Sequence, residues 1–125
     1  MNALRKIHDA LAPGSLLIDT QPVSAHPPAE SASGTFGTLD MSEWARTISA
    51  IDRVVEQVLD DGLFALEHER RYVVTDEYAD GEAFLAITRE WQGTRVHDAL
   101  ATAARRARGR VRLHQEIRLR VLRAR

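Results

Sequence analysis

The chain of 125 residues contains no cysteine, which excludes disulfide bonds, a thiol nucleophile and a cysteine-ligated metal. Its first residues lack the long apolar core and the small-residue cleavage site of a secretory signal peptide. No apolar run approaches the roughly 20 residues that a membrane-spanning helix needs. These absences predict a cytoplasmic protein that does not interact with a membrane.

The motifs of several enzyme classes are also missing. There is no G-x-G-x-x-G stretch, so the usual backbone cradle for a dinucleotide is absent. The five histidines show neither His-x-x-x-His nor His-x-His spacing, which leaves a zinc site unsupported. No serine lies in a G-x-S-x-G context, which argues against a hydrolase triad. We therefore predict no catalytic and no metal-ligating residues.

What is present fits an ordinary globular chain, with 44% hydrophobic and 28% charged residues. The length corresponds to a single domain over residues 1–125, with a modest core.

The stretch 11–22, LAPGSLLIDTQP, places a Pro-Gly turn before a short apolar run. Because Leu16, Leu17 and Ile18 do not alternate with polar residues, they predict a strand over 15–20 that is covered on both faces. Apolar residues at helical spacing predict a helix over 2–12 in front of it. Helix, turn and buried strand form the second half of a βαβ unit, whose first strand is not in this sequence.

Residues 21–35 are rich in proline, serine and alanine and predict a flexible loop. In α/β proteins, a long loop at the carboxyl end of a parallel strand often forms a binding site. Asp19, Gln21 and His26 surround this end and are the candidate substrate-side residues, as acceptors or a weak base. The alternative is a disordered connector, in which Asp19 and Gln21 only satisfy the loop backbone.

Hydrophobic periodicity predicts the remaining elements: a helix over 40–61, a strand over 63–78, helices over 80–91 and 94–108, and a strand over 110–123. Asp40 and Glu43 resemble a capping box, and Asp80 and Thr94 are expected helix caps. The polar middle of the strand over 63–78, residues 67–71, suggests a section that either runs into solvent or carries a bulge. The last strand alternates apolar residues with arginines and should pair antiparallel with 63–78. It should leave Arg118 and Arg120 on its outer face and bury the other face, formed by Val111, Leu113, Gln115, Ile117, Leu119 and Val121.

The carboxyl-terminal 25 residues carry nine arginines against a single acid, Glu116. Such a basic strand can bind nucleic acid through the phosphates. The alternative is that the arginines pair with acidic residues of neighbouring strands, as alternating surface charges often do. The chain has one lysine and few aromatic residues for base stacking, which weakens the nucleic-acid interpretation.

The opening residues ALRKIHDALAPGSLLIDTQP resemble one stretch of the class I S-adenosylmethionine-dependent methyltransferases. In that family a helix ends in a leucine-x-Pro-Gly-Gly turn and leads into the fifth strand. Leu11-Ala12-Pro13-Gly14-Ser15 takes the place of this turn, with Ser15 instead of the second glycine. The following elements are similar to the family's later ones: a helix, a sixth strand, and an antiparallel seventh strand between the fifth and sixth. The helices predicted over 80–108 would be an insertion.

The resemblance covers essentially the whole chain, but only the carboxyl-terminal half of the family's domain. It implies an α/β fold, with a small mixed sheet of about three principal strands, the last one antiparallel, flanked by helices. The family's cofactor-binding residues precede this half, so no cofactor-binding residue is carried over. The isolated chain would then bind no cofactor, and S-adenosylmethionine would bind only if a partner supplied the glycine-rich half.

The expected function is therefore a methyltransferase-like half domain that cannot bind S-adenosylmethionine or transfer a methyl group alone. Whether it counts as an enzyme stays open. The strand over 15–20 would leave one edge unpaired, which predicts a homodimer or a separate partner that carries the amino-terminal half. The alternative is a non-enzymatic dimeric interaction module, with the arginine-rich carboxyl-terminal strand as a nucleic-acid contact.

Overall fold

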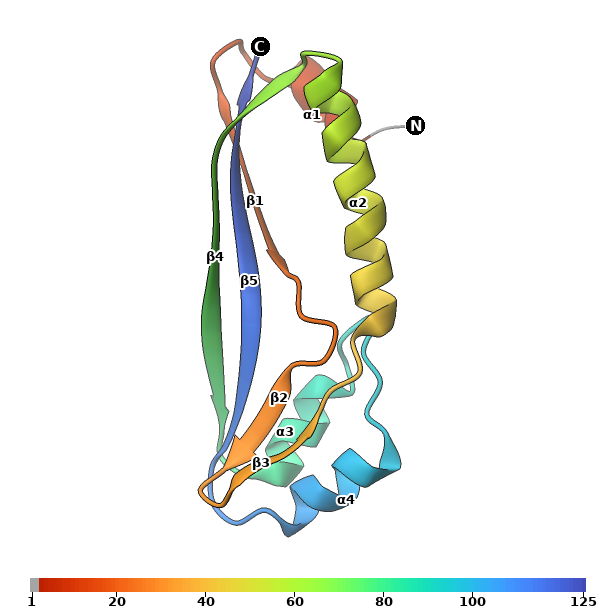
Figure 1. The fold of residues 1–125 in the computed structure, drawn as a ribbon, viewed down its shortest axis with the longest axis vertical. Coiled ribbons are helices and arrows are strands. Elements are labelled where there is room, and N and C mark those ends of the chain that lie inside the picture. The colour runs from red at the N-terminus through yellow and green to blue at the C-terminus, as the bar shows by residue number, and fades with distance from the viewer. Residues whose placement is uncertain (1–2) are drawn as a thin grey trace.

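The computed structural model describes residues 3–125 as one sheet flanked by four helices (Figure 1). In chain order the elements are α1 (Ala3–Ala10), β1 (Leu16–Pro22), β2 (Pro28–Ser31), β3 (Gly34–Thr38), α2 (Ser42–Asp60), β4 (Phe64–Tyr78), α3 (Gly81–Thr88), α4 (Asp98–Arg106) and β5 (Val111–Ala124). The predicted α/β class is confirmed. No helix within residues 3–125 has the length and apolar character needed to cross a bilayer.

β5 is the centre of the five-stranded sheet (Figure 1). It pairs along one edge with β4 and along the other with β1 and then β2, while β3 pairs with β2. Every pairing is antiparallel, so β1 and β4 run in the same direction on either side of β5. The antiparallel last strand is confirmed. The predicted mixed sheet is wrong: β5 separates the co-directional β1 and β4, and every pair of neighbouring described strands is antiparallel.

A β-hairpin occupies much of the segment for which the sequence predicts a loop. β2 and β3 pair with each other, and Ala29 of β2 also pairs with Leu113 of β5 and is fully buried. Gly34 takes a φ of 112° at the hairpin turn, a conformation that glycine adopts without strain. The predicted loop over 21–35 is therefore wrong at its first two residues, which belong to β1, and from Pro28 onward. The sequence signal was weak because β2 is only four residues long and contains no large apolar or β-branched residue.

Two hydrophobic cores lie on opposite faces of β5. One packs β5 against α1 and α2, around Phe64, Val58 and Leu122. The other packs it against α3 and α4, around Phe84 and Leu113. Leu113 and Leu122 are an odd number of positions apart, and side chains of a strand alternate between its faces, so these two residues face opposite sides.

This arrangement corrects the predicted inward face of the last strand. Val111, Leu113 and Gln115 are buried as predicted, but beyond them the buried positions change to Arg118, Arg120 and later even-numbered residues. The reason is that the two helical layers cover different faces at different ends of the strand. A single alternating pattern cannot show where the covered face changes.

The bulge that the sequence suggests in β4 is confirmed between Leu66 and His68. A bulge inserts one extra residue and so reverses the face on which the following side chains lie. As a result Phe64 and Tyr78, an even number of positions apart, pack into different cores. Without the bulge both rings would point to the same face.

The helix ends agree only in part with their predictions. Asp80 caps α3 as expected, because its Oδ1 accepts a hydrogen bond from the Ala83 N–H at 2.8 Å. The Asp40–Glu43 capping box is wrong: α2 has Met41 as its N-cap, and Asp40 Oδ1 accepts instead from the N–H of Ser42 at 3.0 Å and from its hydroxyl at 2.6 Å.

The second carboxylate oxygen of Asp40 lies 2.7 Å from His97 Nε2. The Ser42 hydroxyl, followed by His97, holds the pKa of Asp40 far below its ordinary value. A backbone bridge between Asp40 and Arg95 keeps the residues before His97 extended. For this reason the helix predicted to begin after Thr94 begins only at Asp98. α3 ends earlier than predicted, at Thr88.

Gly81 of α3 packs tightly against the backbone of Ala104 in α4. A Cβ at this position would lie 1.8 Å from the carbonyl oxygen of Ala104 and 2.5 Å from its carbonyl carbon. Because the obstacle is backbone, the two helices would have to move apart. We expect Gly81→Ala to lower the free energy of unfolding by about 1–3 kcal/mol, as measured by urea denaturation.

The neighbouring variant Glu82→Ala is the matched control. It removes only an exposed ion pair with Arg105, so the free energy of unfolding should change by about 0.5 kcal/mol or less. If Gly81→Ala were as stable as this control, the close approach of the two helices would be contradicted.

Candidate functional site

β1 has one paired edge and one open edge. Just outside its two ends, the Ser15 carbonyl oxygen accepts a hydrogen bond from the Ala124 N–H, and the Val23 N–H donates to the Glu116 carbonyl oxygen. Because backbone groups alternate in direction along an antiparallel strand, Leu16, Ile18 and Thr20 direct their N–H and C=O groups away from β5. No strand within residues 3–125 pairs with this edge. β1 therefore offers a short row of backbone donors and acceptors to a further strand.

An apolar groove of about 500 Å³ runs beside the open edge, between α1, β1 and α2. Its walls are mainly aliphatic, with Ile7, Ile18 and Val54 among the lining residues. Ile18 is 61% exposed and Leu16 is 49% exposed, which is unusual for large aliphatic residues on one short strand. The prediction that this strand is covered on both faces is therefore wrong. Open backbone groups and exposed aliphatic side chains thus occur on the same strand.

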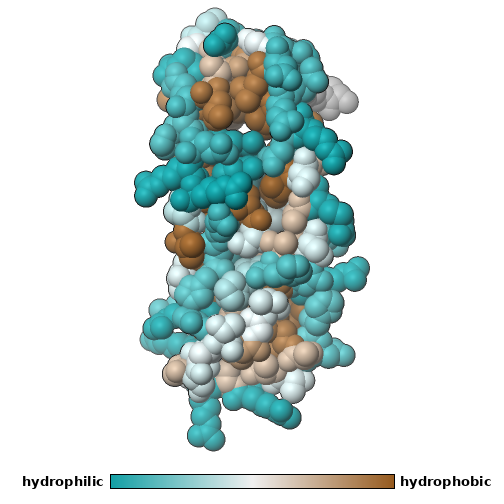
Figure 2. Space-filling view, viewed as in Figure 1, coloured by the Kyte–Doolittle hydropathy of each residue, from teal (hydrophilic) through white to brown (hydrophobic). Residues whose placement is uncertain are grey.

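Near the top of the view in Figure 2, apolar side chains gather between the sheet and α2, with hydrophilic side chains around them.

Trp44 limits the open edge at the end of β1, because its indole N–H donates to the Pro22 carbonyl oxygen at 2.9 Å. The unpaired part of β1 is therefore limited to the residues before Pro22.

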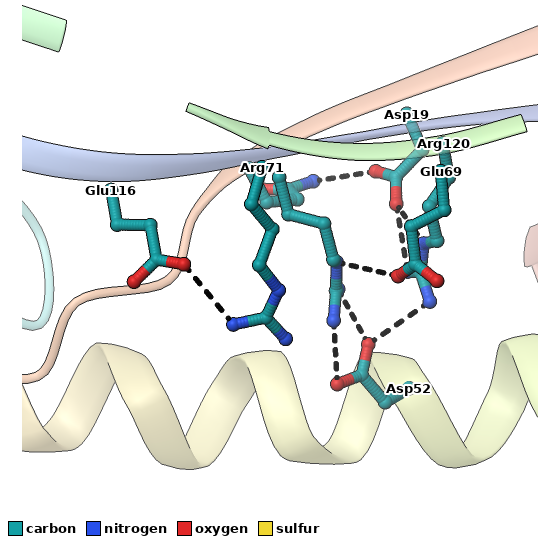
Figure 3. A network of polar contacts seen from close by, with 8 residues as sticks. Asp19, Asp52, Glu69, Arg71, Glu116 and Arg120 are labelled. Carbon is teal, nitrogen blue, oxygen red and sulfur yellow. Dashed lines mark hydrogen bonds and ion pairs between the residues drawn. The ribbon is translucent and has the colours of Figure 1, made fainter. Parts of the chain in front are cut away.

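A network of ion pairs around two buried arginines lies between α2 and the strands of the sheet (Figure 3). The Arg118 guanidinium donates to both carboxylate oxygens of Asp52, at 2.6 and 3.1 Å. The Arg120 guanidinium donates to Asp19 Oδ2 at 2.7 and 3.1 Å and also lies 3.2 Å from Asp52 Oδ1. Arg118 and Arg120 are only 5% and 6% exposed. The network joins β1, α2 and β5 at a single point.

The ionisation of this network is stabilised by its own members. Burial raises the pKa of Asp52, but hydrogen bonds and charge from Arg118, and then from Arg120, hold it below its ordinary value on balance. The hydrogen bond to Asp52 likewise raises the pKa of Arg118. Both groups therefore remain charged at neutral pH, and their ion pairs hold α2 against the sheet.

Two of the three predicted substrate-side residues lie together in the structure. Gln21 Nε2 donates to Asp19 Oδ1 at 3.1 Å, and Asp19 is also ion-paired with Arg120. His26 is exposed, and no hydrogen bond or ion pair joins it to the other two among the described residues. Asp19 is therefore paired with an arginine of the sheet. The alternative interpretation, in which Asp19 satisfies the backbone of the loop, names a different partner. Both carboxylate oxygens of Asp19 are thus already engaged by side chains of the protein.

The sequence contains a signal for the ion network that periodicity alone does not reveal. Asp52 lies four residues after Ile48 and three before Val55, and both are buried on α2. An acid in the middle of a buried helical stripe needs a cationic partner. Arg118 and Arg120 supply it, although their alternation pattern predicts an outward-facing position.

The histidines connect elements and do not form a metal site. His114 Nε2 lies 2.8 Å from Glu30 Oε1 of β2, and its Nδ1 lies 2.8 Å from Thr75 Oγ1 of β4. Through His114 of β5, these contacts link the hairpin to β5 and to β4. Within residues 3–125, no group of three or more possible ligands could hold a metal ion.

Most arginines of the carboxyl-terminal segment are ion-paired with acids of other elements. The ion-paired ones are Arg105, Arg110, Arg118, Arg120 and Arg123. In contrast, Arg106, Arg108 and Arg112 form no ion pair or side-chain hydrogen bond with any described residue. Cross-strand pairing thus explains much of the basic segment, and the positive charge left over is concentrated near the junction of α4 and β5.

Comparisons with known proteins give no further identification: no family model, curated protein or solved structure matches the chain.

Proposed function

We propose that the chain is a methyltransferase-like half domain whose open β1 edge docks the strand of a partner. The order β1-β5-β4, with β5 antiparallel between two co-directional strands, supports this proposal because the methyltransferase resemblance implies the same order. Gly14 supports it as well, since its φ of 86° suits the Pro-Gly turn that carries the resemblance.

The single observation that carries the docking step is the open edge beside the apolar groove. A strand added there would use the outward backbone groups of Leu16, Ile18 and Thr20 and would cover exposed aliphatic side chains. In the half-domain proposal this strand belongs to a glycine-rich half, supplied either by a preceding part of the same polypeptide or by a separate chain. That half would bring S-adenosylmethionine, with Asp19, Gln21 and His26 on the substrate side. We place the half domain in the cytoplasm.

A second candidate function is a non-enzymatic dimeric interaction module. The exposed Leu16 and Ile18 favour it, because two copies of an open apolar edge can pair with each other. In this case the edge itself is the functional site, and no cofactor is involved.

Calorimetry of the 125-residue chain with S-adenosylmethionine tests the half-domain proposal. We expect no heat of binding at micromolar concentration, because the chain has no glycine-rich cradle for the cofactor. S-adenosylhomocysteine serves as the matched ligand, since it shares the nucleoside but not the sulfonium charge. Binding of either compound by the chain alone at micromolar affinity would contradict the proposal.

Sedimentation of the same sample tests docking. We expect a dimer at micromolar concentration when no partner is present, because the open edge can pair with a second copy. A stable monomer, in which the backbone amides of Leu16 and Ile18 are nevertheless protected from deuterium exchange, would contradict an open edge.

A further inference from the structure

A second hollow, of about 660 Å³, lies between the β2–β3 hairpin and α4, away from the β1 edge. Its volume falls within the range of about 300–1,000 Å³ that is typical of small-ligand sites. The lining includes two arginines, three hydroxyl side chains and one aromatic ring: Arg106, Arg108, Ser31, Ser33, Thr102 and Phe36. A site with these side chains would distinguish among ligands better than a surface that is only basic.

The two arginines of the hollow are free to bind a ligand. Arg106 and Arg108 form no ion pair with any described residue, unlike their neighbours Arg105 and Arg110, which pair with acids of other elements. Arg106 lies in the last turn of α4, where a cation also stabilises the helix dipole. Arg108 lies beyond the end of the helix, so the dipole does not account for it. Asp98 is the single acid in the lining and leaves an excess of positive charge.

The hydroxyl groups add hydrogen-bond donors beside this charge. The Ser33 N–H donates to Ser31 Oγ at 3.3 Å, which leaves the O–H group of Ser31 free to donate. Guanidinium groups together with hydroxyl donors match the oxygen atoms of a phosphate group. Phe36 of β3 also lines the hollow; it is half-buried, and its ring makes an edge contact with Phe84 at a centroid distance of 6.3 Å. The ring is therefore held in place as an apolar surface for the remainder of a ligand.

We propose that this hollow binds a small organic phosphate. Arg106 and Arg108 hold the phosphate group with the help of the serine and threonine hydroxyls, and Phe36 packs against the organic part. The proposal is independent of the methyltransferase-like function, because none of these residues lies on the β1 edge.

Titration of the chain with adenosine monophosphate, followed by backbone amide NMR shifts, tests the proposal. We expect saturable shifts at residues 31–36 and 102–108, and none with adenosine, which lacks the phosphate. The double variant Arg106→Ala/Arg108→Ala should weaken binding about tenfold or more, because it removes charged hydrogen bonds. Ser33→Ala should weaken it by a smaller factor, and all variants should keep the circular dichroism spectrum of the parent.

Arg112→Ala is the matched control, since Arg112 is exposed and has no ion pair but does not line the hollow. We expect its affinity for adenosine monophosphate to stay within about twofold of the parent, because Arg112 contributes no direct charged hydrogen bond. An equal loss in Arg112→Ala would show diffuse charge and overturn the proposal. Equal binding of adenosine, or no binding of adenosine monophosphate, would also overturn it. Tight binding of a random oligonucleotide that depends equally on all three arginines would assign the surface to nucleic acid instead.

Discussion

Replacement of Arg118 by methionine is expected to lower the free energy of unfolding by about 3 kcal/mol, near the lower end of the range for breaking a buried ion pair. Arg118 is 5% exposed and donates two hydrogen bonds to Asp52, so its loss leaves a half-buried carboxylate with a single cationic neighbour, Arg120. That remaining contact keeps the effect from being larger. Urea denaturation followed by tryptophan fluorescence measures the difference.

Two further variants separate the ion network from a general effect of charge. Arg123→Met removes an exposed ion pair with Glu67 and a hydrogen bond to the Gly14 carbonyl oxygen, and should cost about 1 kcal/mol or less. The double variant Arg118→Met/Asp52→Leu should recover much of the stability lost in Arg118→Met, because it removes the unpaired carboxylate as well. A loss in Arg118→Met no larger than in Arg123→Met would show that the buried network does not hold α2 on the sheet.

Local sequence patterns predict the elements of this fold well wherever residues close together in the sequence determine the local structure. The spacing of apolar residues over 40–61 corresponds to α2, and the polar interruption of the strand over 63–78 corresponds to the bulge in β4. Asp80 caps α3 because its side chain reaches an N–H only three residues away. Each of these features depends on residues that are close together in the sequence.

Predictions are wrong where a distant element decides the structure. β2 is a strand because β5 and β3 offer hydrogen bonds to its backbone, although its side chains give little signal. The residues before α4 are extended because Arg95 bonds to the backbone of Asp40, and that contact also displaces Asp40 from its expected capping role. Propensity is a weak prior in such places, since tertiary contacts override it.

The buried arginines illustrate the same limit at the candidate site. Alternation assigns Arg118 and Arg120 to the outer face because it assumes that one face of β5 is covered along its whole length. α2 instead covers the other face over this half of the strand, so both side chains are enclosed and need carboxylates. Asp19 is therefore part of the ion network, and its position at a strand end alone cannot distinguish this role from substrate binding.

Ile18→Lys is expected to dissociate any assembly that forms through the β1 edge. Ile18 is 61% exposed and lines the apolar groove, so in an assembly the lysine would place a charge among aliphatic side chains. The loss of one buried isoleucine contact is worth about 1.5–3 kcal/mol, which corresponds to a roughly ten- to hundredfold larger dissociation constant. Sedimentation equilibrium of the parent and the variant measures this change.

Thr20→Pro tests the backbone contribution to the same edge, because the N–H of Thr20 points away from β5 and its loss leaves the β1–β5 pairing intact. It should weaken the assembly as well. Thr20→Pro introduces no charge, so its effect cannot be attributed to the charge that Ile18→Lys places at the edge. Val73→Lys is the matched control: Val73 is 65% exposed on β4, whose outer edge is also unpaired within residues 3–125 and lies across β5 from the β1 edge, so an assembly through β1 should be unaffected. If Val73→Lys weakened the assembly as much as Ile18→Lys, or if neither β1 variant weakened it, then the chains would associate through a different surface. The open edge would in that case not be the docking site.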